Sequence, residues 1–440
     1  MYSSLKATTF QTGRPLHGMR ARRRIALLGG TTTLADCLLA LRYVANPGLL
    51  IQGPAIMEYE QAFARQIGVR YACSFSAGRV GLYGLLQTLG VGPGDEVLLQ
   101  VPTHIVVANA VRYTRARPVY VDCRLETYNM DLERAERQIT PRTKVLILQH
   151  TFGIPADLDA VLTLARRYRI EVIEDCVHAL GAIYDGRPIG SFGRAAFFST
   201  EETKTISSTM GGMVVTDDPN LAARIQAFQA SCAWPASWLT ARYLLKFILY
   251  YLLTEPHLHR YTRAFYELLG RRHPLPRATT EEELRGARPA NYEQRLSNAQ
   301  AALALRQLRR LESNLAHRRT VANVYNARLS ERGFGVPQPP AKANPAFVRY
   351  PVWVEDRAVA QRITAPHAVL GTWFTSVLEE AVSPVCSGYE MGSCPRAEAA
   401  VRQLVNLPTH PRVSLQDVEA IVAAMARVAS ITQLKSREFR

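Results

Sequence analysis

The stretch that decides the fold runs from residue 171 to residue 216 and reads EVIEDCVHALGAIYDGRPIGSFGRAAFFSTEETKTISSTMGGMVVT. It holds three short apolar runs, at residues 171–174, 195–199 and 212–216, which glycine-containing turns separate. Apolar runs of this length, rich in Val, Ile and Phe, predict strands that are buried on both faces of a sheet. The stretch therefore predicts the centre of an α/β sheet.

The same pattern continues toward the N-terminus. Further strands are expected at residues 71–74, 96–101, 118–122 and 144–149. Amphipathic segments of helical length lie between them, at residues 80–90, 105–115, 132–139 and 158–169. Buried strands that alternate with helices predict a mostly parallel sheet that lies between two layers of helices.

The rest of the chain divides into regions of different character. We interpret residues 1–52 as a basic N-terminal arm with a first helix, residues 53–227 as a large domain, residues 228–290 as an apolar and basic inserted segment, and residues 291–440 as a connecting helix followed by a small C-terminal α/β domain. In the small domain we expect a strand at residues 348–354 and a closing helix at residues 414–428, with Ser414 as its N-cap.

Composition sets the class of protein and of partner. The 440 residues are 48% hydrophobic and 20% charged, which is ordinary for a globular protein and excludes disorder and a multi-span membrane protein. Lys and Arg number 53 against 37 Asp and Glu, so the net charge is +16. This balance favours an anionic partner: nucleic acid, a phosphorylated small molecule or an acidic membrane surface.

The seven cysteines are odd in number and form no CxxC pair. This spacing predicts free thiols in a reducing compartment and no metal site. Three arginines, Arg22 to Arg24, precede an apolar run, but Gly29-Gly30 interrupts that run too early for a secretory signal. We therefore expect a cytoplasmic protein.

Several polar residues follow the predicted strands, at the edge where open α/β sheets bind their ligands. Asp175 comes directly after one strand, and Lys204 follows another strand that ends at Ser199. A turn of small residues that includes Gly78 leads through Arg79 into a helix, whose free N–H groups suit a phosphate. Taken singly, each feature also fits a structural or solvated residue.

In this order, the features belong to a longer series of motifs. The series includes Gly53-Pro54, Gly92-Pro93-Gly94-Asp95-Glu96-Val97, Pro118-Val119-Tyr120-Val121-Asp122, Gly153-Ile154-Pro155-Ala156-Asp157, Ile173-Glu174-Asp175, Ser199 before Lys204 with Gly211-Gly212 beyond, Gln300-Ala301-Ala302, and Asn406-Leu407-Pro408. It resembles the DegT/DnrJ/EryC1/StrS family of sugar aminotransferases, which use pyridoxal phosphate (PLP) and have the PLP-dependent transferase fold type I. The resemblance covers most of the chain, but neither the N-terminal arm nor residues 228–290.

The resemblance implies a role for each site residue. Lys204 would be the catalytic residue, which forms a Schiff base with PLP and moves a proton, and Asp175 would pair with the pyridinium nitrogen. His104 would stack on the ring, and His178 would touch the side of its phenolic oxygen. The implied cofactor-binding set is Gly78, Arg79, His104, Asp175, His178, Ser199 and Lys204, with Gly78, Arg79 and Ser199 at the phosphate.

Some positions depart from the family pattern. Arg79 stands where the family often has Ser or Thr, and it could bind phosphate through a charge-assisted hydrogen bond. Met210 stands where many members have Glu, and Asn291 is the candidate for the asparagine that the partner subunit contributes. We expect Glu201 and Glu202 to lie on a solvated face of the loop.

The implied function is the transfer of an amino group from an amino acid, glutamate above all, to a nucleotide-linked keto sugar. The two half-reactions predict ping-pong kinetics, and the fold implies a homodimer. Two alternatives remain. The acceptor could be a cyclitol or another keto compound, or the protein could be a non-catalytic interaction or regulatory protein with this fold. The presence of Lys204 and Asp175 favours an enzyme. Because no helix-turn-helix or zinc signature occurs, we expect no nucleic-acid partner.

The apolar run at residues 243–253 is too short to cross a bilayer, which needs about 20 residues. Three interpretations stay open for this region: a helix at a subunit interface or over the substrate, docking on a membrane surface, or contact with a partner protein. Residues 1–24 hold six basic and no acidic side chains. We therefore predict peripheral contact with a membrane surface.

Overall fold

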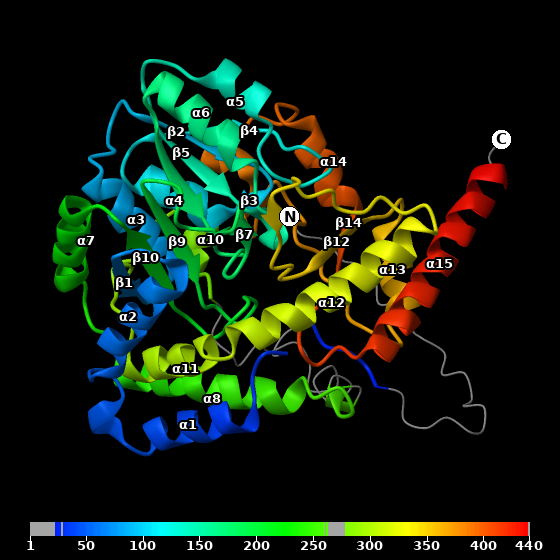
Figure 1. Ribbon diagram of the computed structural model, residues 1–440, viewed down its shortest axis with the longest axis horizontal. Helices are drawn as coiled ribbons and strands as arrows, with labels where there is room; N and C mark the ends of the chain where they lie inside the picture. The colour runs from blue at the N-terminus through cyan, green and yellow to red at the C-terminus, as the bar shows by residue number, and fades with distance from the viewer. Residues whose placement is uncertain (1–22, 28–29, 260, 263–277, 439–440) are drawn as a thin grey trace.

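A computed structural model describes residues 23–27, 30–259, 261–262 and 278–438. Its centre is a seven-stranded sheet with the strand order β1-β10-β9-β6-β5-β2-β4 (Figure 1). The strands are β1 (Tyr71–Phe75), β2 (Glu96–Gln100), β4 (Arg117–Val121), β5 (Thr143–Gln149), β6 (Glu171–Asp175), β9 (Ala195–Ser199) and β10 (Gly212–Thr216). Only β10 runs antiparallel to its neighbours, so the prediction of a mostly parallel sheet is confirmed.

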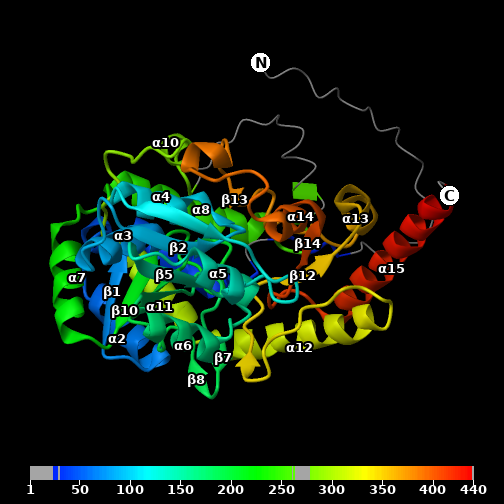
Figure 2. The ribbon, with the colours of Figure 1, turned by 90° about the horizontal axis from the view of Figure 1, so that it is seen from above.

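Helices cover both faces of this sheet. They are α2 (Ala55–Ile67), α3 (Gly78–Thr88), α4 (Ile105–Tyr113), α5 (Leu132–Gln138), α6 (Leu158–Tyr168), α7 (Pro219–Ser231) and α11 (Asn298–Leu308). One core cluster joins α3, α4 and α7 to one face, and a second joins α2, α5, α6 and α11 to the other. Figure 2 shows α3 and α4 on the opposite side of the sheet from α6 and α11.

Burial on both faces explains the continuous apolar strands. In β2, Val97 and Leu99 belong to one core cluster, and Leu98 between them belongs to the other. Because successive side chains of a strand point to opposite faces, every position must be apolar when both faces are covered.

The C-terminal part begins where α11 ends. It contains α12 (Leu311–Ser330), β12 (Tyr350–Trp353), α13 (Arg357–Thr364), α14 (Pro395–Gln403), β14 (Leu404–Leu407) and α15 (Leu415–Glu438). Strands β12 and β14 pair antiparallel, and a capping box of Ser414 and Asp417 starts α15, as predicted. The expected connecting helix is two helices, α11 and α12, with a turn at residues 309–310 between them.

Short elements complete the description. They are β3 (Thr103–His104), β7 (Ile183–Tyr184), β8 (Arg187–Pro188), α10 (Glu281–Leu284), β11 (Ala343–Asn344), β13 (Leu378–Glu379) and the 3-10 helices η1 (Pro47–Leu49), η2 (Thr151–Gly153) and η3 (Pro384–Ser387). Strand β3 pairs with β13 in parallel, which brings the C-terminal part of the chain against the edge of the large sheet.

Two further helices pack on α11 at the lower edge of Figure 1: α1 (Leu34–Val44) and α8 (Ser237–Leu253). Most of the basic arm, residues 1–22, lies outside the described residues, as do residues 263–277. Within the residues that the structure covers, no helix has the length and apolar content needed to cross a bilayer.

Asp36 joins α1 to the turn between α11 and α12. Its fully buried carboxylate contacts Arg306 and Arg310 at 3.1 and 2.7 Å, and it also caps the start of α1 through Thr33. The ion pair thus attaches α1 to the protein at the turn between α11 and α12.

Replacing Asp36 by alanine removes the carboxylate of an ion pair and a helix cap. Because the Arg306 and Arg310 side chains are 43% and 35% exposed, water can solvate them in the variant, and we expect the free energy of unfolding to fall by about 2 kcal/mol. Urea unfolding followed by circular dichroism measures the change. Asp217→Ala is the control because Asp217 pairs with Arg70 at the exposed surface; equal losses in the two variants would contradict the prediction.

Candidate active site

All seven residues of the implied cofactor-binding set line one cavity of about 150 Å³ at the C-terminal ends of β6 and β9. These strands are neighbours in the sheet, and Asp175 pairs with Phe197 in their parallel register. The Asp175 carboxylate and the loop that carries Lys204 therefore leave the sheet at the same edge. The roles of the seven side chains stay predictions.

Asp175 is the most informative of these residues. Its side chain is 1% exposed, and one carboxylate oxygen, Oδ1, accepts a hydrogen bond from the N–H of Val177 at 3.1 Å. The other oxygen, Oδ2, is buried and has no hydrogen-bond partner among the residues that the structure describes. Burial raises the pKa of Asp175 to about 7. A pyridinium N–H would supply the missing donor, so this residue fits PLP.

Lys204 lies close to a tryptophan from the C-terminal part of the chain. Its Nζ is 4.3 Å from the ring centroid of Trp373. Burial lowers the pKa of Lys204 to about 8; the charge of Arg349 acts in the same direction, and the carboxylate of Glu201 opposes it. About one amine in ten is then neutral at pH 7. A neutral amine is the form that reacts with a carbonyl group.

The phosphate end of the cavity is the start of α3. Gly78 is the first residue of this helix, and no side chain caps it. The N–H of Val80 donates to the carbonyl of Ala77, so the N–H groups of Gly78 and Arg79 are the ones available to an anion. A Cβ atom at Gly78 would lie 2.9 Å from the carbonyl oxygen of Phe198, and this close approach requires glycine. The Ser199 hydroxyl lines the same end of the cavity and accepts the N–H of Glu201.

The Arg79 guanidinium has another partner. Its Nε lies 2.5 Å from the Glu283 carboxylate on α10, and its Nη2 donates to the carbonyl of Ala278 at 2.6 Å. Its side chain is therefore engaged with the segment 278–290, while its backbone N–H belongs to the first turn of α3. No sequence signal pointed to Glu283, which lies 204 positions away in the inserted segment.

Both predicted histidines line the cavity. The His104 Nε2 lies 3.2 Å from Glu380, and its Nδ1 accepts the N–H of Val106. The His178 ring stacks on Trp373 with centroids 4.5 Å apart. Burial, together with Lys204 and Arg349 nearby, holds the pKa of His178 well below its usual value, so its ring is neutral.

Sequence analysis missed three residues of this site: Arg349, Trp373 and Glu380. The Arg349 guanidinium lies 3.5 Å from the Trp373 ring centroid, and Trp373 and Glu380 both line the cavity. All three come from the C-terminal part of the chain, which the pairing of β3 with β13 brings to the site. Their sequence neighbourhood shows no periodicity that would have indicated this position.

The expectation that Glu202 lies on a solvated face is wrong. Its side chain is only 14% exposed and pairs with Lys246 of α8 at 2.9 Å. Burial and the neighbouring Glu201 raise the pKa of Glu202 to about 7. Glu201 itself lines the cavity and accepts the N–H of Thr203. The buried pair connects the Lys204 loop to the inserted segment.

A second cluster, of His150, Glu174 and Cys176, places three ligand-type atoms within 4.8 Å of one another. The His150 Nδ1 accepts the N–H of Ala156, so its Nε2 carries the proton that faces Glu174 at 3.2 Å. The Glu174 oxygens accept three further backbone N–H groups. These bonds give the cluster a structural role.

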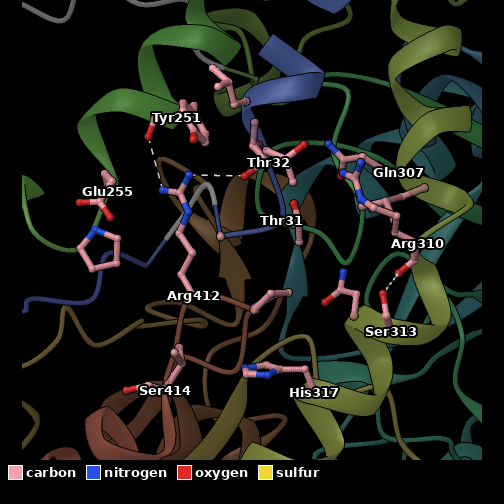
Figure 3. Close-up of a pocket in the computed structure, with 18 of the residues that line it drawn as sticks. Thr31, Thr32, Tyr251, Glu255, Gln307, Arg310, Ser313, His317, Arg412 and Ser414 are labelled. Atoms are coloured by element: carbon pink, nitrogen blue, oxygen red, sulfur yellow. Dashed lines mark hydrogen bonds between the residues drawn. The ribbon is translucent and has the colours of Figure 1, made fainter. Parts of the chain in front are cut away.

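A separate, roomier pocket of about 640 Å³ is drawn in Figure 3. Its walls come from residues 30–34, the end of α8, the start of α12 and residues 411–414, and neither Lys204 nor Asp175 belongs to them. Arg412 crosses it and donates to carbonyl oxygens of Tyr251 and Thr32. This pocket is therefore distinct from the candidate active site.

The parallel sheet, with Asp175 at the end of one strand and Lys204 after the next, defines the class of PLP-dependent transferases of fold type I. Within this class, the sequence model of the DegT/DnrJ/EryC1/StrS aminotransferase family matches residues 34–241 and 252–426. The chain belongs to this family, and the resemblance seen in its motifs is confirmed.

Individual relatives agree. The chain is 31% identical over 381 residues to GDP-perosamine synthase of Caulobacter vibrioides, which covers 86% of this chain and 90% of that protein. It is 28% identical to the spore coat polysaccharide biosynthesis protein SpsC of Bacillus subtilis, over 86% of this chain and 90% of SpsC. The solved structure of S. venezuelae DesV superposes with a TM-score of 0.70 at 28% identity, over 89% of this chain and 94% of that one. The protein is an aminotransferase that acts on a sugar.

The lowered pKa of Lys204 can be tested by chemical labelling of the cofactor-free protein. Acetic anhydride acylates only neutral amines, so labelling of Lys204 should rise with pH through about 8. Lys342 is the control within the same chain because its bonds to Asp159 raise its pKa. Mass spectrometry of each peptide gives the two midpoints; a Lys204 midpoint at or above that of Lys342 would contradict the prediction.

Proposed function

We propose that the protein binds PLP in the Asp175–Lys204 cavity and moves an amino group from glutamate to a nucleotide-linked keto sugar. The observation that carries this proposal is the buried Asp175 Oδ2, which lacks a donor among the described residues inside a cavity that also holds a lysine with a lowered pKa. Perturbed, buried titratable groups that share one cavity are typical of catalytic sites.

Different residues of the cavity would bind different parts of the cofactor. The N–H groups at the start of α3 and the Ser199 hydroxyl would hold the phosphate, and Asp175 would accept the pyridinium N–H. The neutral His178 ring and the Trp373 ring would enclose the site and exclude water. When bound, PLP supplies an electron sink for charge that develops on the α-carbon of the amino acid.

Lys204 would both hold PLP covalently and act as the general base. With a pKa of about 8, its Nζ would be able to take up and release the proton of the α-carbon of the amino acid at neutral pH. Glu201, which lines the cavity, raises the pKa of Lys204, and Arg349, which packs on Trp373, lowers it. Their balance would keep the amine close to its working pKa.

The acceptor is proposed to carry a nucleotide diphosphate. A net charge of +16 gives the protein a general attraction for such anions. A relative named GDP-perosamine synthase supports a nucleotide-linked sugar, and the amino group of glutamate is the proposed source. A cyclitol or another keto compound is the alternative acceptor.

We also propose a cytoplasmic homodimer. The fold type I resemblance supports the dimer, in which Asn291 of the partner subunit is the candidate for completing the phosphate site. All seven cysteines are free, and all except Cys386 are buried, which supports a reducing compartment.

Two substitutions test the chemistry. We expect Lys204→Ala to abolish amine transfer from glutamate, because it removes the amine that would hold the cofactor and move the proton. We expect Asp175→Asn to slow the transfer by roughly 10²- to 10³-fold, because it removes the carboxylate that would pair with the pyridinium N–H. The measurement is the 2-oxoglutarate released in a single turnover. Lys342→Ala, on the exposed surface, is the control and should keep full activity. Activity of Lys204→Ala equal to that of the unmodified protein would overturn the assignment.

An acceptor panel tests the substrate class. After the protein has been aminated by glutamate, nucleotide-linked keto sugars should take up the amine at least tenfold faster than the free keto sugar or a keto cyclitol. Mass spectrometry identifies the aminated product. Equal rates with the free sugar would contradict the nucleotide-linked acceptor and leave the sugar aminotransferase assignment intact.

A further inference from the structure

Helices α1 and α8 together present an exposed apolar surface, here named the α1–α8 face. Its members are Leu34, Leu38 and Leu41 on α1 and Trp238, Leu245, Leu249 and Leu252 on α8, each between 37% and 67% exposed. On each helix these residues recur at intervals of three, four or seven, which places them on one side. Both helices pack on α11 through their buried residues (Figure 1), so the two exposed rows lie on their other sides.

The inner sides of the two helices are firmly attached to the protein. Leu244 and Phe247 of α8 pack in one core cluster with residues of α1 and α11. The buried Lys246 pairs with Glu202 in the Lys204 loop. At the far end of α8, Arg412 donates to Thr254 and to the Tyr251 carbonyl, as Figure 3 shows for Tyr251. The exposed side is therefore a fixed surface.

The exposed charged residues of the two helices are all cationic, whereas the remaining charged residues of these helices are buried in ion pairs. Asp36 and Lys246 are buried and paired on the inner sides. The charged residues that α1 and α8 expose are Arg42 and Arg242, and both are cationic. Two aromatic side chains, Trp238 at the start of α8 and Tyr261 beyond its end, are 67% and 63% exposed. Cationic and aromatic residues around leucines are typical of surfaces that lie in a membrane interface.

We propose that the α1–α8 face docks the protein on an anionic lipid surface. The leucines would enter the boundary between headgroups and acyl chains, and the arginines would contact the acidic headgroups. The net charge of +16 adds a long-range attraction toward such a surface. This proposal rests on the surface alone and is independent of the proposed substrate.

A second copy of the chain is the other occupant to consider. An interface between two such faces would enclose the cationic Arg42 and Arg242 of both copies, and their like charges repel. The residues 242–251, which carry Arg242, Leu245 and Leu249, also fall between the two ranges that match the family. This part of the α1–α8 face thus lies outside the sequence pattern that defines the family.

Sedimentation with lipid vesicles tests the docking. In low salt, the full-length protein should bind vesicles of phosphatidylglycerol and phosphatidylcholine at least tenfold more strongly than vesicles of phosphatidylcholine alone, and 0.5 M salt should weaken this binding. Absence of binding, or equal binding to both vesicle types, would overturn the proposal.

Variants on the face locate the contact. The double variant Leu38→Glu with Leu245→Glu should lose at least tenfold in binding to anionic vesicles, because it places two carboxylates against acidic headgroups. Met391→Glu is the matched control: this methionine is 60% exposed in the turn before α14, which lies far from α1 and α8 in Figure 1, and its variant should bind normally. Binding by the double variant equal to that of the control would overturn the location.

Two further measurements distinguish lipid docking from misfolding of the variant and from contact between two copies. Unchanged thermal unfolding and 2-oxoglutarate release in the double variant show that its loss of binding comes from the surface. Analytical ultracentrifugation without lipid reports the oligomeric state. If the double variant dissociates into smaller species while the unmodified protein fails to bind vesicles, the face is an interface between copies and the lipid proposal is wrong.

Discussion

The Glu174 carboxylate fixes the chain path on which the site depends. It is fully buried at the end of β6, accepts the N–H groups of Gly190, Phe192 and Gly193, and faces the Nε2 proton of His150. A buried carboxylate is costly unless its lone pairs are satisfied, and here the bonds that satisfy it hold residues 190–193 against β6. The chain enters β9 directly after them, beside and parallel to β6. Asp175 and the Lys204 loop can therefore meet at one edge of the sheet.

Burial sets the chemistry of that edge. It raises the pKa of Asp175 to about 7 and lowers the pKa of Lys204 to about 8, so each group titrates close to neutral pH. Loss of hydration disfavours the charged form of both residues, which explains the opposite directions of the two shifts. A bound group that donates a hydrogen bond to Asp175 and offers a carbonyl to Lys204 would relieve both costs. The same burial that costs stability prepares the cavity for its cofactor.

Periodicity predicted the sheet well, because strands covered on both faces are continuously apolar and their ends fall within a residue or two of the predicted positions. The order of Asp175 and Lys204 in the motifs also predicted that they share a site. The remaining contacts depend on long-range pairing. Trp373 reaches the cavity through the pairing of β3 with β13. Glu283 reaches Arg79 from 204 positions away, in a segment that we expected to lie outside the family resemblance but that the family model matches from residue 252 onward. The burial of Glu202 could not be predicted from the sequence, because it depends on an ion pair with Lys246 of α8, which is 44 positions away.

Helix α8 contacts the Lys204 loop with its inner side and is exposed to solvent on its outer side. Its inner side holds Glu202, two residues before Lys204, through the buried Lys246, whereas its outer side carries the leucines of the α1–α8 face. Contact with a lipid surface would involve only the outer side and would leave the buried ion pair unchanged. Separating a buried ion pair costs free energy, so we expect docking to leave the position of the Lys204 loop unchanged. The proposed surface attachment and amine transfer are therefore separable, and α8 would fix the orientation of the active site relative to the lipid surface.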